Sequence, residues 1–258
     1  MKVVIIGSGN VATVLGKKMH LAGVEILQVI SRNKVEGPGL AKTLDASYTA
    51  SFSEINKNAD SYMIAVSDTY ISSIASKLKL KNKIIFHTAG SVSKNVLQHA
   101  NNFSCTYGVI YPLQSLKKEN QTLPPVPVLV DGSDSKTILT LKDFAATWAE
   151  NVAAATDEQR LKMHIAAVFS SNFTTFMYVL ADEFCNAEHL DFKMLLPLIN
   201  ETCDRLQLHN PAAMQTGPAV RKDIPTINLH IDVLSKYPRL QGMYKVISAE
   251  ILDQAFPR

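Results

Sequence analysis

The segment Gly7-Ser8-Gly9-Asn10-Val11-Ala12 decides the fold of this 258-residue chain. It follows an apolar run at residues 3–6 and opens an amphipathic helix. A glycine-rich turn between a strand and a helix is typical of a dinucleotide-binding βαβ unit, where the helix N-terminus faces a pyrophosphate. Gly7 permits the tight turn, Gly9 lets the backbone approach the ligand, and Ala12 suffices where helix and strand pack closely. A purely structural turn is the alternative interpretation.

The end of the second predicted strand distinguishes between cofactors. NAD-binding proteins carry an Asp or Glu there for the ribose hydroxyls, whereas this chain reads Ser31-Arg32-Asn33. Ser31 removes the repulsive carboxylate, and Arg32 can pair bidentately with a 2′-phosphate. The sequence therefore predicts NADP as the cofactor, with a solvated loop arginine as the alternative. The predicted cofactor-binding residues are Gly7, Ser8, Gly9, Asn10, Val11, Ser31, Arg32, Asn33, Ala65, Val66, Ser67, His87 and Ala89.

Strand-like and helical segments alternate as far as about residue 132, which predicts an α/β fold with a doubly wound, Rossmann-like domain. Three prolines between residues 124 and 127 predict an edge strand or a join, because each proline removes a donor from the sheet. The expected strands lie at residues 3–6, 25–30, 61–66, 83–88, 105–110, 126–130 and 152–155. The expected helices lie at residues 10–22, 36–45, 69–78, 92–100 and 135–150.

From Thr156 onward the chain is predicted to be all helical. Thr156-Asp157-Glu158-Gln159 matches a capping box, and no Gly or Pro interrupts the chain from there to about Cys185. Apolar residues surround much of this long helix, which predicts burial on several sides. We expect an NADP-binding domain at residues 1–154 and a helical domain for substrate binding and dimerisation at residues 155–258. The later helices are expected at residues 192–207, 225–236 and 239–255.

The composition excludes several classes of protein. Hydrophobic residues make up 47% and charged residues 19% of the chain, and the net charge of +3 is scattered, with tight basic pairs such as Lys17-Lys18. This pattern predicts a globular protein without a nucleic-acid partner. Three cysteines lack CxxC spacing, and no cluster of residues has metal-ligand spacing, so we expect no metal and a reducing compartment. With neither a signal pattern nor an apolar span, a cytoplasmic protein without membrane contact is expected.

The residues also resemble a known superfamily. The glycine turn, Ser31-Arg32-Asn33, Ala65-Val66-Ser67-Asp68 and the long helix resemble the group that contains pyrroline-5-carboxylate reductase and 6-phosphogluconate dehydrogenase. Within that group, the chain is similar to a family labelled NADP oxidoreductases, which joins a Rossmann-like domain to its own helical C-terminal domain. The similar segments are His87–Ser91, Tyr111–Ser115, His164–Ala167 leading to Asn172, and Thr216–Asp223. The family's labels also mention a deazaflavin, a name that we attribute to the shared nucleotide domain.

This resemblance spans nearly the whole chain and implies hydride transfer between NADP and a small substrate in a cleft between the domains. It also implies a homodimer formed through the helical domain. The leading hypothesis is therefore an NADP-dependent oxidoreductase whose substrate the sequence does not name. An NADP-binding sensor without turnover is the alternative. A methyltransferase that binds S-adenosylmethionine is disfavoured, because Arg32 stands where an acidic residue is usual.

His87, His164 and Asn172 are the predicted catalytic residues. His87 follows a strand end and can act as a proton donor with a pKa near neutrality, or it can be a structural histidine. His164 and Asn172 fall near one face of the long helix by α-helical spacing. The related β-hydroxyacid dehydrogenases carry a lysine where this chain has Val168, which favours the sensor and makes His164 the substitute proton source in an enzyme.

Two further segments offer polar groups to a ligand. The turn at Thr216-Gly217-Pro218, with Arg221 nearby, can present amides and a cation to an anionic substrate, or can simply cap a helix. Gln114 follows a strand end, where its amide can orient a ligand.

Overall fold

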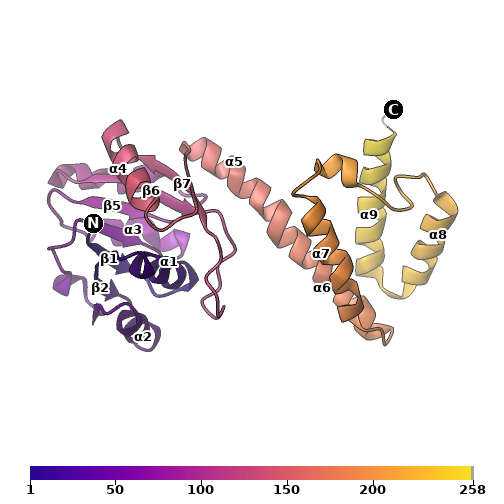
Figure 1. Ribbon diagram of the computed structural model, residues 1–258, viewed down its shortest axis with the longest axis horizontal. Coiled ribbons are helices and arrows are strands. Elements are labelled where there is room, and N and C mark those ends of the chain that lie inside the picture. Colours follow the sequence, from indigo (N-terminus) through magenta and orange to yellow (C-terminus); the bar gives the residue numbers. More distant parts are fainter. Residues whose placement is uncertain (257–258) are drawn as a thin grey trace. The chain divides into compact units, whose positions relative to one another are not determined.

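The computed structural model describes residues 1–256, which form two compact units. The first unit is Met1–Phe173, and the second begins at Thr174. Figure 1 follows the chain from the indigo strands of the first unit to the yellow C-terminal helix of the second. The first unit includes the start of the long helical stretch, whose first turns bond to loops of the sheet.

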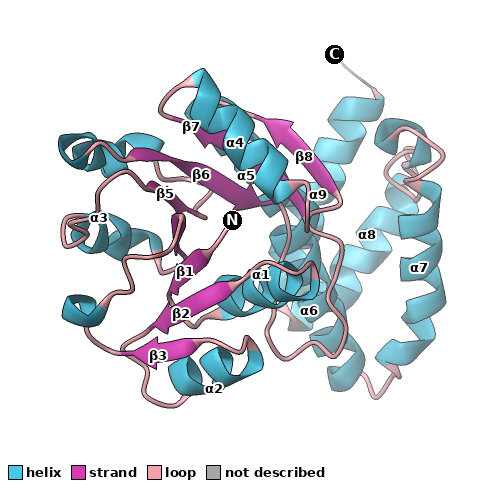
Figure 2. Cartoon of the chain, turned by 60° about the vertical axis from the view of Figure 1, so that its left-hand side comes forward, coloured by secondary structure: helices cyan, strands magenta, loops and turns pink. Residues whose placement is uncertain are grey.

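An eight-stranded sheet forms the centre of the first unit, in the order β3-β2-β1-β4-β5-β6-β7-β8 (Figure 2). All neighbouring strands are parallel except β6 and β7, which are antiparallel. The strand order reverses between β1 and β4, which is the switch point of a doubly wound sheet. The strands are β1 (Val3–Ile6), β2 (Ile26–Ile30), β3 (Ser47–Thr49), β4 (Ser61–Ile64), β5 (Ile84–His87), β6 (Thr106–Pro112), β7 (Pro127–Gly132) and β8 (Asn151–Ala154).

Helices cover both faces of this sheet. The side chains of β1 alternate between two hydrophobic clusters, with Val3 and Ile5 in one and Val4 and Ile6 in the other. The first cluster contains residues of α1 (Asn10–Leu21), α2 (Glu36–Thr43) and α4 (Ser135–Ala145), and the second contains residues of α3 (Ile71–Ala75) and the 3-10 segment η3 (Lys94–Phe103). A strand that is apolar on both faces therefore lies in the middle of three layers. The predicted α/β class is confirmed.

Two details of the sheet differ from the expectations. The short strand β3 was not predicted, because its three residues are too few to show a period. The proline-rich segment does not lead to an edge strand but joins β6 to β7, which lies between β6 and the edge strand β8. Pro127 is tolerated there because it is the first residue of β7, where its carbonyl accepts a bond from the Leu113 amide at 2.8 Å.

The long helical stretch begins as predicted and then changes its winding. Both bonds of the capping box are present, from the Gln159 amide to Thr156 Oγ1 at 3.3 Å and from the Thr156 amide to Gln159 Oε1 at 2.9 Å. The α-helix α5 (Asp157–Ala167) is followed by a π-helical segment, η4 (Val168–Phe173). Because π-helices bond from i to i+5, α-helical spacing does not hold beyond Val168.

The second unit consists of helices with few buried residues. Its α-helices are α6 (Thr174–Ala187), α7 (Leu196–Arg205), α8 (Ile224–Val233) and α9 (Pro238–Ala255), with the 3-10 segments η5 (Phe192–Leu195), η6 (Pro211–Met214) and η7 (Leu234–Lys236). Large apolar side chains along the long stretch are exposed, among them Phe169 at 65% and Phe173 at 50%. The predicted burial on several sides is therefore wrong for the single chain. None of the helices within residues 1–256 is long and apolar enough to cross a membrane.

Candidate functional site

One cavity of about 920 Å³ lies at the carboxyl ends of β1, β2 and β4, at the switch point of the sheet. Ligands of open α/β sheets bind at this position. Eleven of the thirteen predicted cofactor residues line the cavity, while His87 and Ala89 do not. The eleven are Gly7, Ser8, Gly9, Asn10, Val11, Ser31, Arg32, Asn33, Ala65, Val66 and Ser67.

The two glycines of the first turn have different surroundings. Gly7 has a φ of +125°, and a Cβ atom placed there would lie 2.0 Å from the carbonyl oxygen of Ala65. A Cβ on Gly9 would meet nothing within 4 Å. Gly9 caps α1 without any side-chain bond to the first amides of that helix. The turn thus combines an obligatory glycine, open space and a helix N-terminus, and this arrangement fits a pyrophosphate.

The end of β2 holds its polar residues in place by internal hydrogen bonds. Ser31 Oγ lies 2.7 Å from Ser8 Oγ and accepts a bond from the Asn33 amide at 3.2 Å. Asn33 Oδ1 accepts the amides of Val35 and Glu36, each at 3.0 Å, at the start of α2. Ser31 and Asn33 therefore join the glycine turn to the strand end and shape the site around the neighbouring arginine.

The Arg32 guanidinium lies over the ring of Tyr70, with 4.9 Å between its Cζ and the ring centroid. This arrangement is a cation–π contact that leaves the N–H edges of the guanidinium available for an anion. The contact keeps the cation at the wall of the cavity.

A second wall of the cavity was missed from the sequence. Tyr70, Ser73, Ile74 and Lys77 all line the cavity, and their spacing of three, one and three residues places them on one helical face. Phe52 lines the same cavity from the loop after β3. The spacing alone could have been read from the sequence, but the sequence could not show that this face meets the end of β2.

His87 is fully buried at the end of β5. Burial, followed by the positive charge of Arg160, lowers the pKa of its imidazole to about 4. The expected pKa near neutrality is therefore wrong. Its Nδ1 accepts the Ala89 amide at 3.2 Å, so the proton of the neutral ring belongs on Nε2. Among the described residues, His87 Nε2 has no hydrogen-bond partner. This histidine is a neutral donor, not a proton-exchanging acid at pH 7.

Arg160 was not singled out from the sequence, yet it ties the loop after β5 to α5. Only 1% of its surface is exposed. Its Nε donates to the Gly90 carbonyl at 3.2 Å, and its Nη2 donates to the Val92 carbonyl and to Asp157 Oδ1. Burial raises the pKa of Asp157, but hydrogen bonds from Ser93 and Arg160 outweigh it and lower that pKa below its ordinary range. Arg160 thereby holds the backbone of this loop at the carboxyl edge of the sheet.

His164 and Tyr111 meet over Gly90. The Tyr111 hydroxyl and His164 Nδ1 are 2.9 Å apart, and the two rings stack edge to face with centroids 5.8 Å apart. A Cβ on Gly90 would lie 2.9 Å from both His164 Nδ1 and the Tyr111 ring. Burial raises the pKa of the Tyr111 phenol. The pair links β6, the loop after β5 and α5 in a single polar contact.

The remaining predicted residues have other surroundings. Asn172 is exposed within the π-helical segment, so the predicted common face with His164 has no α-helical basis there. Asp223 caps α8 by accepting the Thr226 amide at 3.2 Å, which supports a capping function for the turn at residues 216–223. The Gln114 amide donates to the Pro125 carbonyl at 3.1 Å.

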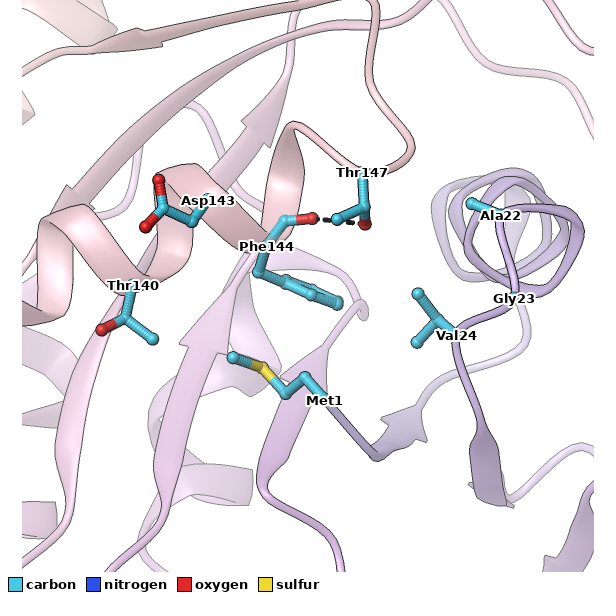
Figure 3. A pocket seen from close by; sticks show the side chains of 8 residues that line it. All are labelled: Met1, Ala22, Gly23, Val24, Thr140, Asp143, Phe144 and Thr147. Atoms are coloured by element: carbon cyan, nitrogen blue, oxygen red, sulfur yellow. Dashed lines mark hydrogen bonds between the residues drawn. The ribbon is translucent and has the colours of Figure 1, made fainter.

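A smaller cavity of about 440 Å³ lies at the other end of β1 (Figure 3). Its wall includes Met1, Gly23 and Phe144, and Thr147 donates its hydroxyl to the Phe144 carbonyl at 2.8 Å. None of the predicted site residues lines it. Within residues 1–256, no group of three or more His, Cys, Asp or Glu side chains could hold a metal ion.

Comparison with known proteins relates the two parts of the sequence to two families. Residues 2–89 match a family described as "NADP oxidoreductase coenzyme F420-dependent", and residues 126–251 match a domain of unknown function. A crystal structure of a "putative NADP oxidoreductase" from Bacteroides fragilis is 34% identical, covers 98% of both chains and has a TM-score of 0.88. The chain belongs to this NADP oxidoreductase family. The predicted family and its cofactor, NADP, are confirmed, and the methyltransferase interpretation is set aside.

Two more distant structures share the fold of this family member. An imine reductase from Myxococcus stipitatus in complex with NADP+ has 14% identity, covers 97% of this chain and 93% of its own, and has a TM-score of 0.64. A 1-pyrroline-5-carboxylate reductase from Streptococcus pyogenes has 12% identity, 98% coverage of both chains and a TM-score of 0.62. No curated protein sequence matches the chain. At these identities the likeness concerns the fold alone.

Proposed function

We propose that this family member is an NADP-dependent oxidoreductase that transfers a hydride between the cofactor and a small-molecule substrate. The observation that carries the proposal is the cavity at the switch point. It combines the obligatory Gly7, the open space over Gly9 and the cation of Arg32 in one lining. A pyrophosphate and a 2′-phosphate are the anionic groups of NADP; the glycine turn would bind the first and Arg32 the second.

When bound, NADP supplies or accepts the hydride. The chain's residues then have to bind the cofactor, orient the substrate and supply or accept a proton. We assign the proton source to His164, whose Nδ1 is held by Tyr111 at 2.9 Å. His87 contributes a neutral N–H at the same edge of the sheet, and Asn172 stays a candidate for orienting the substrate. Hydrides from NADPH reduce imines, 2-keto acids and aldehydes, which are the substrate classes to test.

Arg32→Ala tests the cofactor assignment. Because a charge-assisted hydrogen bond contributes about 1.5–3 kcal/mol, we expect NADPH binding to weaken roughly 10- to 100-fold while NADH binding changes little. Fluorescence titration with both nucleotides measures this. Lys34→Ala is the matched control, since Lys34 is an exposed cation two residues away that does not line the cavity. Equal losses for NADPH and NADH would contradict a 2′-phosphate site at Arg32.

Turnover separates the enzyme from the sensor. NADPH oxidation is followed with a panel of imines, 2-keto acids and aldehydes as substrates. His164→Gln is expected to lower kcat without weakening NADPH binding. Tight NADPH binding without turnover on any compound would support the sensor, which the valine at position 168 also favours. A variant that loses NADPH binding together with kcat would argue against a proton-donating role for His164.

We also propose a homodimer formed through the helical unit. Side chains such as Leu198, Leu229 and Val246 are each at least 60% exposed on three different helices. A water-soluble chain rarely leaves this much apolar surface uncovered. A second copy of the same chain is the simplest partner.

The three unpaired cysteines, of which Cys203 is exposed, further support a reducing, cytoplasmic setting.

A further inference from the structure

The segment Lys77-Leu78-Lys79-Leu80-Lys81-Asn82-Lys83 follows α3 and places a lysine at every second position. Leu78 and Leu80 are each only 2% exposed and belong to the cluster beneath the sheet. The leucines therefore anchor the segment and direct the lysines outward. Of its four lysines, only Lys77 lines the cavity at the switch point.

Lys77 is positioned by two contacts. Its amide donates to the Ile74 carbonyl at 3.0 Å, which continues the turn of α3 and keeps its side chain on the face that lines the cavity. Its Nζ lies 5.8 Å from the ring centroid of Phe52, another lining residue. The arrangement repeats that of Arg32 on Tyr70, so each of the two cations lies against an aromatic ring of the same cavity.

The charges of the cavity point to its ligand. Arg32 and Lys77 are its two charged lining residues, and none of the described lining residues is an Asp or Glu. A phosphate monoester carries a charge of about −1.5 to −2 at neutral pH, which two cations would balance. The pyrophosphate has its own binding group in the amides at the glycine turn.

We propose that Lys77, which follows α3, is the second cation of the 2′-phosphate subsite, together with Arg32 at the end of β2. This assignment rests on the proposed function, because it presupposes that NADP occupies the cavity. The preference for NADP over NAD would then depend on two residues, Arg32 after β2 and Lys77 after α3, which are 45 residues apart in the sequence.

The test compares Lys77→Met with Lys79→Met by titration calorimetry. Lys79 is an exposed residue of the same segment but does not line the cavity. The probes are NADPH and 2′,5′-ADP, which carry the 2′-phosphate, and NADH and 5′-AMP, which lack it. We expect Lys77→Met to weaken the binding of the two 2′-phosphorylated probes about 5- to 30-fold and to leave the binding of the other two unchanged. Lys79→Met should change the binding of none of them.

Each other outcome is informative. Equal weakening by Lys77→Met and Lys79→Met, or equal losses for NADPH and NADH, would overturn the subsite and indicate diffuse attraction by surface charge. If Lys77→Met binds NADPH like the wild type while Arg32→Ala does not, this assignment fails and the proposed function stands. If the wild type binds neither NADPH nor 2′,5′-ADP, the proposed function itself fails. Lys77→Gln repeats the measurement should the methionine variant misfold.

Discussion

The sheet unit and the helical unit differ in how they bury apolar surface. In the sheet unit, both faces of the central strands lie inside hydrophobic clusters, and residues such as Val3 and Ile5 have no exposed surface. In the helical unit, the buried apolar residues are Leu180, Cys185, Ala219, Ile227 and Leu234. A unit of this size needs a larger core to be stable alone. The sheet unit therefore buries its core within one chain, whereas the helical unit leaves much of its apolar surface exposed, which is what the proposed homodimer would cover.

The largest expected effect would come from charges on the helical unit. Phe176 and Val179 lie three residues apart on α6, at 40% and 43% exposure. Because glutamates at both positions would have to be buried in the interface of the proposed homodimer, Phe176→Glu with Val179→Glu should weaken self-association at least 1,000-fold, about 4 kcal/mol. Sedimentation equilibrium measures this effect.

Leu139→Glu is the control for that variant. Leu139 is 59% exposed on α4 in the sheet unit, where no partner is needed, so its replacement should leave association and stability unchanged. A double variant that associates like the wild type would remove the contrast between the two units.

The second-largest effect concerns the two glycines of the cofactor turn, which lies within the sheet unit. Gly7→Ala should destabilise the fold by about 3 kcal/mol, because the new methyl group overlaps the Ala65 carbonyl and the φ of +125° is unfavourable for alanine. Gly9→Ala should leave the free energy of unfolding nearly unchanged and weaken NADPH binding, since its methyl group would enter the open space. Denaturant unfolding and NADPH titration of both variants give the comparison. Equal stability losses would show that the turn is merely structural.

The smallest effect is a pH dependence that arises from His87 inside the sheet unit. Its folded pKa of about 4 lies below its unfolded value of 6.5, so the unfolded state binds the proton first as the pH falls. Between pH 7 and pH 5 the histidine should therefore cost about 2 kcal/mol of folding stability. The free energy of unfolding of the wild type should fall by that amount more than that of His87→Gln. If the free energy of unfolding changed equally with pH in the two proteins, His87 would be solvated in the folded state.

Much of the fold could be predicted from local patterns. The capping box at Thr156, the glycine turn at Gly7 and most strands depend on residues close together in the chain, and the structure has them at the predicted places. The expected burial of the long helix is not found within the single chain, because periodicity shows that a helix has an apolar surface but not what covers it. The π-helical winding after Val168 has no local signal in the sequence.

At the site, the glycine turn and the strand end that places Arg32 could be recognised from the sequence, because both are continuous segments with a known local geometry. The tertiary structure alone decided which distant groups meet. It brought Lys77 to the cavity that Arg32 lines, set Tyr111 against His164, and surrounded His87 with enough protein to lower its pKa to about 4. The physical reason is that propensity and spacing act over a few residues, whereas burial and electrostatics depend on every segment that folding brings nearby.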